Sequence, residues 1–119
     1  MKNKILIIDD DDDILEALKI LLTKSGYEVM VCKDGSLTSE KAIQFSPDLI
    51  ILDVLLSGVD GLNICKILKS DKNLQKIPLI MFSAHPTAEA QARTCGADGF
   101  IAKPFTAQKL LEEIRKQID

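Results

Sequence analysis

The sequence predicts an α/β domain in which a parallel sheet lies between two layers of helices. Short apolar runs alternate with amphipathic stretches five times along 119 residues, which is the length of one domain. These runs are apolar at nearly every position, and strands of this kind are typically buried on both faces of a parallel sheet. We therefore expect a three-layer, doubly wound, five-stranded domain that spans residues 1–119.

Strands are expected where the apolar runs lie between polar residues, glycine or proline, which interrupt regular structure. In chain order they are 5–8, 27–32, 49–52, 79–82 and 100–102. In the first half of the chain, a helix is expected over 14–22, where aliphatic residues recur at helical spacing. Asp11–Asp13 precede it as N-cap and first-turn acids, and Gly26 follows as a C′ residue.

A second helix is expected over 36–45, after a turn at Asp34-Gly35, although its apolar spacing is poor. It ends at Ser46-Pro47, because the residue before a proline disfavours helix. A third helix follows a turn at 58–61 and precedes a polar loop over 70–76. Its apolar residues are Ile64, Ile67 and Leu68.

The remaining two helices flank the last strand. Pro86 suits the first position of a helix that runs to about Cys95. Thr106 caps the final helix, whose inner face is predicted to carry Leu110, Leu111, Ile114 and Ile118.

Composition narrows the class of protein. Hydrophobic residues make up 46% of the chain, charged residues make up 28%, and the net charge is −3. This balance is typical of a globular cytoplasmic domain and argues against direct nucleic-acid binding or membrane insertion. Cys32, Cys65 and Cys95 are widely spaced and odd in number. We expect reduced, mostly buried thiols, with a metal–thiolate site as the alternative.

Polar residues follow four of the five predicted strands at the point where each strand ends. Asp9-Asp10 follow the first strand, Asp53 the third, Ser83 the fourth and Lys103 the fifth. Ligands of open α/β sheets bind outside the carboxyl ends of the strands, and neighbouring strands lie about 4.8 Å apart. We therefore expect these side chains to converge on one site.

Three carboxylates in one site repel one another and require a cation. Carboxylate oxygens and waters suit Mg²⁺, and a lysine with a hydroxyl suits an anion such as a phosphoryl group. Aspartate is also a competent phosphoryl acceptor. The residues alone therefore predict a Mg²⁺-dependent aspartyl-phosphate site.

The same residues resemble the receiver domains of response regulators in two-component signalling systems. Matching motifs run through the whole chain in the family's order. They are Ile7-Ile8-Asp9-Asp10-Asp11, Pro47 to Asp53, Asp60-Gly61, Ser83-Ala84, Gly96-Ala97-Asp98 and Lys103-Pro104-Phe105. The resemblance implies the flavodoxin-like strand order 2-1-3-4-5, with helices on both faces.

The resemblance also implies a role for each residue. Asp53 is the phosphoacceptor, and it attacks a phosphohistidine on a sensor histidine kinase or phosphotransfer protein. Asp10 and Asp53 ligate Mg²⁺ with the backbone carbonyl of Leu55, and Asp9 acts through a metal-bound water. Lys103 pairs with the phosphoryl group.

Further implied features concern signalling. Ser83 reaches a phosphoryl oxygen, and its movement lets Phe100 turn inward and alter the output surface. The Lys103–Pro104 peptide bond is expected to be cis. Ser57 stands where the family often has proline. The segment from Ser83 to Phe100 is short, which predicts a short or reoriented fourth helix.

Several residues also have plainer interpretations. Ser83 alone would be an ordinary strand-end residue, and Phe100 would serve equally well as core. We interpret His85 as a bystander and Asp60-Gly61 as turn residues.

Three functions compete: a phosphorylatable switch that catalyses only its own phosphorylation and dephosphorylation, a phosphotransfer enzyme or hydrolase, and a constitutive interaction module or phosphorelay intermediate. The first is favoured because every acceptor, metal and lysine position is present. We expect a downstream protein target or a fused output domain, and a monomer or weak homodimer. The sequence leaves open whether the chain stands alone or belongs to a longer protein.

Overall fold

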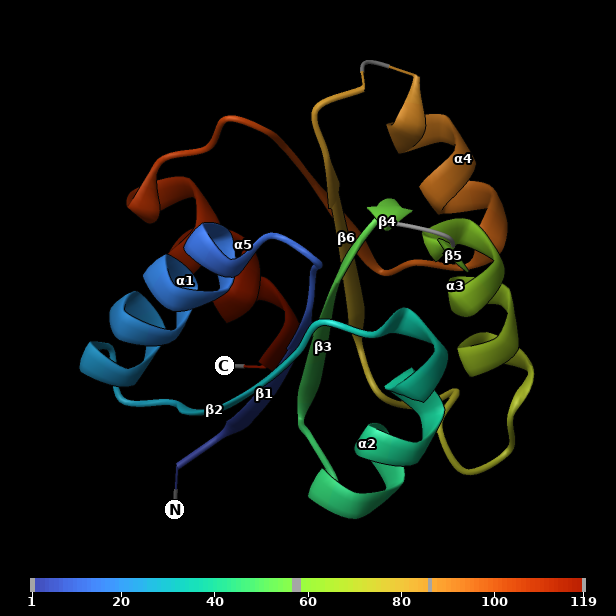
Figure 1. Ribbon diagram of the computed structural model, residues 1–119, viewed down its shortest axis with the longest axis horizontal. Helices are drawn as coiled ribbons and strands as arrows, with labels where there is room; N and C mark the ends of the chain where they lie inside the picture. The colour runs from blue at the N-terminus through green and yellow to red at the C-terminus, as the bar shows by residue number, and fades with distance from the viewer. Residues whose placement is uncertain (1, 57–58, 86, 119) are drawn as a thin grey trace.

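A computed structural model of the chain describes residues 2–56, 59–85 and 87–118 (Figure 1). Its centre is a sheet of five strands that pair in parallel, in the order β2-β1-β3-β6-β7. The strands are β1 (Lys4–Ile8), β2 (Glu28–Cys32), β3 (Leu49–Asp53), β6 (Leu79–Ser83) and β7 (Gly99–Ala102). Counted among these five, this is the predicted order 2-1-3-4-5, so the predicted fold class is confirmed.

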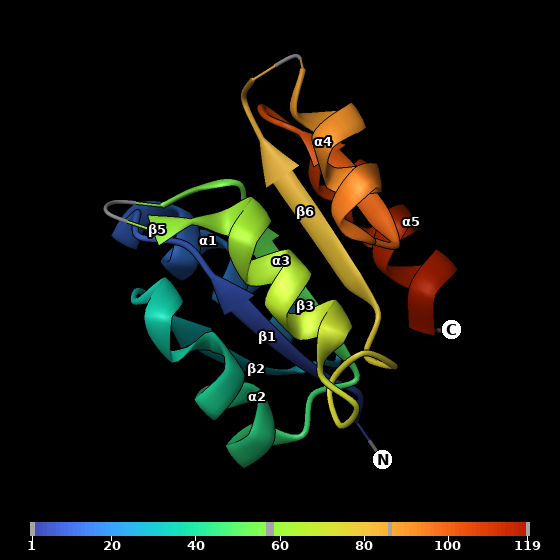
Figure 2. The ribbon, with the colours of Figure 1, turned by 90° about the vertical axis from the view of Figure 1, so that its right-hand side faces the viewer.

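Helices cover both faces of the sheet. Helices α1 (Asp12–Lys24) and α5 (Ala107–Ile118) lie on one face (Figure 1). Helices α2 (Thr38–Phe45), α3 (Gly61–Ser70) and α4 (Ala88–Cys95) lie on the other (Figure 2). Within the described ranges, no helix combines the length and apolar character needed to cross a bilayer.

The two apolar layers of the core come from alternate residues of the central strands. In β1, Ile5 and Ile7 belong to the cluster under α1 and α5, whereas Leu6 and Ile8 belong to the cluster under the other three helices. All residues of β3 and β6 are buried. This two-sided burial explains why the strands are apolar at nearly every position and not at every second one.

Local capping sets the helix ends as expected. The Asp11 carboxylate accepts hydrogen bonds from the backbone N–H groups of Asp13 and Ile14 at the start of α1. The Thr106 hydroxyl accepts one from the Lys109 N–H, at 3.1 Å, at the start of α5. Gly26 has a φ of +99° after α1, a left-handed conformation that favours glycine.

Two regions differ from the sequence-based prediction. The helix predicted over 36–45 is a 3-10 turn, η1 (Gly35–Leu37), followed by α2. The turn predicted over 58–61 includes part of an antiparallel pair, β4 (Leu55–Leu56) with β5 (Val59–Asp60). Helix α4 is as short as expected, with eight residues. The predictions about Ser57, Gly58 and Pro86 lie outside the described residues.

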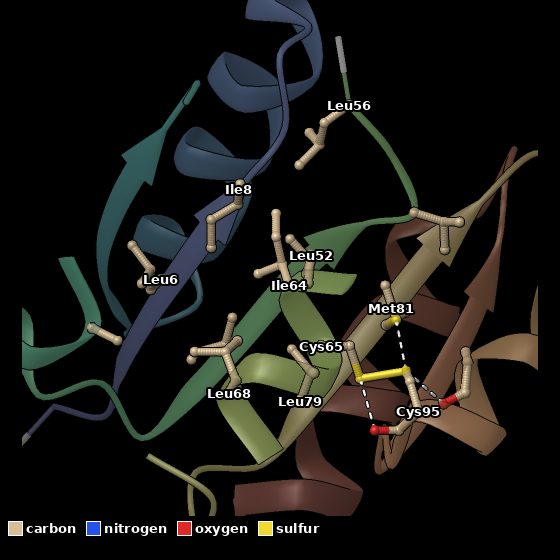
Figure 3. Close-up of a cluster of buried hydrophobic side chains, with 14 of the residues drawn as sticks. Leu6, Ile8, Leu52, Leu56, Ile64, Cys65, Leu68, Leu79, Met81 and Cys95 are labelled. Atoms are coloured by element: carbon tan, nitrogen blue, oxygen red, sulfur yellow. Dashed lines mark hydrogen bonds between the residues drawn. A yellow bond between two sulfur atoms is a disulfide. The ribbon is translucent and has the colours of Figure 1, made fainter. Parts of the chain in front are cut away.

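The expectation of three reduced cysteines was wrong for two of them. Cys65 of α3 and Cys95 of α4 form a disulfide (Figure 3). Cys32 is a buried free thiol. The predicted burial of all three is confirmed. The pairing depends on two helices packing side by side, which brings residues 30 positions apart in sequence to a Cα–Cα distance of 5.9 Å.

Candidate functional site

The sheet gathers the predicted site residues at one edge. Asp53 ends β3 and pairs in register with Phe82, and Ser83 follows as the last residue of β6. Asp9 directly follows β1, and Lys103 directly follows β7. Because all five strands run in the same direction, their carboxyl ends meet at this edge.

Three carboxylates form the acidic part of the site. One oxygen from each of Asp9, Asp10 and Asp53 lies within 4.8 Å of the others. Asp9 is 1% exposed and Asp53 is 6% exposed, whereas Asp10 is half-buried. Such a group of hard oxygen ligands suits a divalent cation such as Mg²⁺.

Lys103 provides a positive charge between two of these carboxylates. Its Nζ lies 3.3 Å from Asp9 Oδ2 and 3.4 Å from Asp53 Oδ1. The ammonium also lies over the ring of Phe82, 4.4 Å from its centroid, and Phe105 contacts that ring edge-on. The following Lys103–Pro104 peptide bond is cis. The Lys103 ammonium is thus held by the carboxylates of Asp9 and Asp53 and by the face of the Phe82 ring.

Burial changes the acidity of the two most buried carboxyl groups. Burial, together with the nearby charge of Asp9, raises the pKa of Asp53 to about 6 against the opposing effect of Lys103 and the Leu55 N–H. Burial also raises the pKa of Asp9, although the Asp11 N–H and Lys103 oppose it. Burial therefore makes both carboxyl groups hold a proton more readily than usual, and Lys103 offsets only part of this effect.

The loop after Asp53 is supported by a glycine that the sequence analysis treated as a turn residue. The Gly61 N–H donates to the Val54 carbonyl at 2.9 Å, and the Asp60 carboxylate caps α3 by accepting from the Leu62 N–H. A Cβ on Gly61 would collide with the carbonyl oxygen of Asp53 and the backbone of Val54. Gly61 therefore lets α3 begin directly against the backbone of Asp53.

Leu55 and Ser83 stand beside Asp53. The Leu55 N–H hydrogen-bonds to the Asp53 carboxylate, and the Leu55 side chain is 66% exposed. Its carbonyl as a metal ligand stays a prediction. Ser83 is buried, and its Oγ accepts a hydrogen bond from the His85 N–H at 3.0 Å. The exposed His85 ring contacts Thr87 Oγ1 through Nδ1, at 2.8 Å.

Phe100 lies in β7, opposite Met81 of β6. It is half-buried and packs against the apolar cluster that includes Ala92 and Cys95 of α4. The roles of two other aromatic residues were not predicted: Phe82 lies under the Lys103 ammonium, and Phe105 packs edge-on against Phe82. The sequence signal for them was adjacency, because each lies next to a predicted site residue in the chain.

The chain matches the family model described as the response regulator receiver domain, over residues 5–115. It is 38% identical over 114 residues to RpaA of Synechocystis sp., described as a DNA-binding dual master transcriptional regulator. That match covers 94% of this chain and 47% of RpaA. The chain spans about half the length of the curated relatives it matches.

Solved structures share the whole fold. The chemotaxis protein CheY4 of Vibrio cholerae has a TM-score of 0.91 at 27% identity, covering 98% of this chain and 99% of that one. The N-terminal receiver domain of RstA from Klebsiella pneumoniae, in its BeF3-activated form, has a TM-score of 0.90 at 25% identity and covers 98% of both chains.

Proposed function

We propose that this chain, which belongs to the response regulator receiver domain family, accepts a phosphoryl group on Asp53 in a Mg²⁺-dependent reaction and signals through its surface. One observation carries the proposal. The Lys103 ammonium lies within 3.4 Å of Asp53, inside a group of three clustered carboxylates. A nucleophilic oxygen, hard cation ligands and a cation for the incoming phosphoryl group are the components that phosphoryl transfer to aspartate needs.

The donor set fits Mg²⁺. Three clustered carboxylates face the Lys103 ammonium, and the pKa of Asp53 is raised mainly by burial and further by the nearby charge of Asp9. Asp10 and Asp53 would hold the ion with the Leu55 carbonyl, and Asp9 would act through a bound water. When bound, the ion neutralises the carboxylates and the transferring oxygens.

The chain's own residues perform the transfer as follows. An Asp53 carboxylate oxygen attacks phosphorus, and the O–P bond forms while the N–P bond of a phosphohistidine breaks and the imidazole leaves. At pH 7 Asp53 is mostly ionised, since its pKa is about 6. Lys103 pairs with the transferred oxygens, and the Ser83 hydroxyl reaches one of them. Catalysis extends only to the chain's own phosphorylation and dephosphorylation.

The signal leaves the site through Ser83 and Phe100. Movement of Ser83 toward the phosphoryl group opens space for Phe100 to turn further inward. Phe100 already packs against the cluster under α4, so its movement is a change in packing. This proposed route is supported by the pairing of β6 with β7, which places Ser83 opposite Ala102. Ala102 is two residues after Phe100.

Family membership supports a sensor histidine kinase or a phosphotransfer protein as the donor. We propose a downstream protein target or a fused output domain as the receiver of the signal, in the cytoplasm, with the chain a monomer or weak homodimer. RpaA is a DNA-binding regulator, and this chain corresponds to about half of it. We expect no direct nucleic-acid contact by the residues of this chain, whose net charge is −3.

Intact-mass spectrometry after incubation with acetyl phosphate tests the proposal. With Mg²⁺, we expect a single adduct of about 80 Da, and without Mg²⁺ none. Asp53→Asn should abolish the adduct. The matched control is Asp60→Asn, which changes an aspartate whose carboxylate caps α3, and it should leave labelling intact. Labelling that persists in Asp53→Asn, or that ignores Mg²⁺, would refute the assignment.

A further inference from the structure

The disulfide between Cys65 and Cys95 lies outside the proposed phosphorylation site. Cys65 is in the middle of α3 and Cys95 is the last residue of α4, so the bond joins two helices on the same face of the sheet (Figure 3). Cys65 is 0% exposed and Cys95 is 6% exposed. The Cα–Cα distance of 5.9 Å is one that disulfides ordinarily span.

The inward side chains of helix α4 are small. Its buried residues are Ala88, Ala92 and Cys95, and its other described side chains are exposed. Alanine buries little apolar area, so Cys95 carries the largest inward side chain of this helix. The neighbouring helix α3 differs, because it buries the larger side chains of Ile64 and Leu68 in the same cluster.

The third cysteine is a natural control. Cys32 ends β2, at the opposite edge of the sheet from α4, and it is the free thiol of the chain among the residues described. Its Sγ donates to the Asp34 carbonyl at 3.2 Å. Bond formation between Cys65 and Cys95 therefore reflects their positions on facing helices, and burial alone does not explain it.

We propose that Cys65 and Cys95 form a reversible thiol–disulfide modification site whose oxidation locks α4 onto α3. The oxidant is a small-molecule disulfide such as glutathione disulfide. One protein thiolate attacks it, its S–S bond breaks and one glutathione leaves as a thiol. The second protein thiolate attacks the mixed disulfide and releases the second glutathione. The two cysteines lose two protons and two electrons, which end on two glutathione thiols.

Because both sulfurs are buried, exchange requires α4 to move away from α3 first. The small inward residues of α4 make that opening easier than for a helix held by leucines. Once formed, the bond restricts α4, which is the first helix after Ser83 and packs near Phe100. Oxidation should therefore limit how far phosphorylation changes the α4 surface. This consequence rests on the proposed function, whereas the bond and its effect on α4 do not.

Equilibration in glutathione redox buffers, followed by thiol counting after denaturation, tests the site. The wild-type chain should go from three titratable thiols to one as the buffer becomes oxidising. Cys32→Ala should form the same bond, and Cys95→Ala should not form it. A wild-type chain that keeps three thiols, or a bond that disappears in Cys32→Ala, would overturn the proposal.

Amide hydrogen exchange then measures the effect of the disulfide on α4. The comparison is between the oxidised and the reduced forms of the same chain. We expect the amides of α4 to exchange at least about tenfold more slowly in the oxidised form, with α1 unchanged. Equal exchange rates of the α4 amides in both forms would refute the proposal that the disulfide restricts α4.

Adding beryllofluoride and following the NMR resonances of α4 tests whether oxidation limits the response of this helix. We expect it to shift α4 resonances in the reduced form and to shift them less in the oxidised form, and equal shifts would refute the consequence. If beryllofluoride bound neither form, the proposed function would fail. The thiol count and the exchange rates would still test the disulfide and its effect on α4.

Discussion

Strand β1 and the residue that follows it are equally buried and chemically opposite. Ile5–Ile8 are each 0% exposed, and Asp9 is 1% exposed. Burial of each aliphatic side chain stabilises the fold by about 1.5–3 kcal/mol. Burial of a carboxylate destabilises it unless a counter-charge is present. One step along the chain therefore separates a region that stabilises the fold from a region that opposes it.

The difference shows where the protein holds its chemistry. The Lys103 ammonium lies within 3.4 Å of both Asp9 and Asp53, yet the pKa of Asp53 still rises to about 6. The compensation at the carboxyl edge of the sheet is incomplete without a metal ion. Substitutions in the apolar core should therefore lower stability and spare the chemistry, whereas neutral substitutions of the buried carboxylates at this edge should do the reverse.

The largest effect is expected in the core under α1. Leu22→Ala removes a fully buried side chain of the apolar cluster that includes residues of β1 and β3, and the free energy of unfolding should fall by about 2–5 kcal/mol in urea titrations. The folded fraction should still label with acetyl phosphate. The control is Ile20→Ala on the same helix, where the side chain is 50% exposed and the loss should be small. Similar losses for both would contradict the comparison.

The next effect is expected at the charged edge. Lys103→Met keeps the aliphatic stem and removes the ammonium, and the rate of labelling of Asp53 should fall about a hundredfold. Single-turnover mass spectrometry measures this rate. Lys33→Met, which breaks an exposed ion pair with Asp12, should label normally. A Lys103→Met chain that labelled as fast as wild type would remove Lys103 from the proposed chemistry.

A smaller effect is expected from pH. The folded pKa of Asp53, about 6, lies above its ordinary value of 3.8, so the folded state binds the extra proton first as pH falls. Without divalent cations, the free energy of unfolding should rise by about 1–2 kcal/mol between pH 7 and pH 5, with Asp9 acting in the same direction. Asp53→Asn should remove most of this rise. If the free energy of unfolding of the wild type fell from pH 7 to pH 5, the buried carboxylates would not be the region that opposes folding.

The smallest effect concerns the cap at the start of α5. Thr106→Ala removes the hydroxyl that accepts the Lys109 N–H at the start of α5, and it should cost about 1 kcal/mol. Thermal unfolding measures the cost, and labelling should not change. Thr94→Ala is the control, because the Thr94 hydroxyl bonds within its own helix to the Ala90 carbonyl and caps nothing. A decrease in labelling for Thr106→Ala would link α5 to the site.

Much of this protein was determined locally, by the sequence itself. The apolar runs specified the five strands, and the polar residues that follow four of them specified which groups reach the carboxyl edge. Asp11 and Thr106 specified helix starts through hydrogen bonds to N–H groups two or three residues away. These features depend on short-range geometry, so a single sequence is enough to predict them.

Other features depended on which distant segments pack together. The sequence predicted that Asp9 and Lys103 share one edge of the sheet, but not that Lys103 Nζ lies 3.3 Å from Asp9 Oδ2 across 94 positions, nor that Cys65 bonds Cys95 across 30. The need for glycine at Gly61 comes from its approach to the backbone of Asp53. The raised pKa of Asp53 comes from the depth of the site. Only the tertiary structure decided these, because contact distance and burial arise when the layers pack, and neither is a property of any short stretch of sequence.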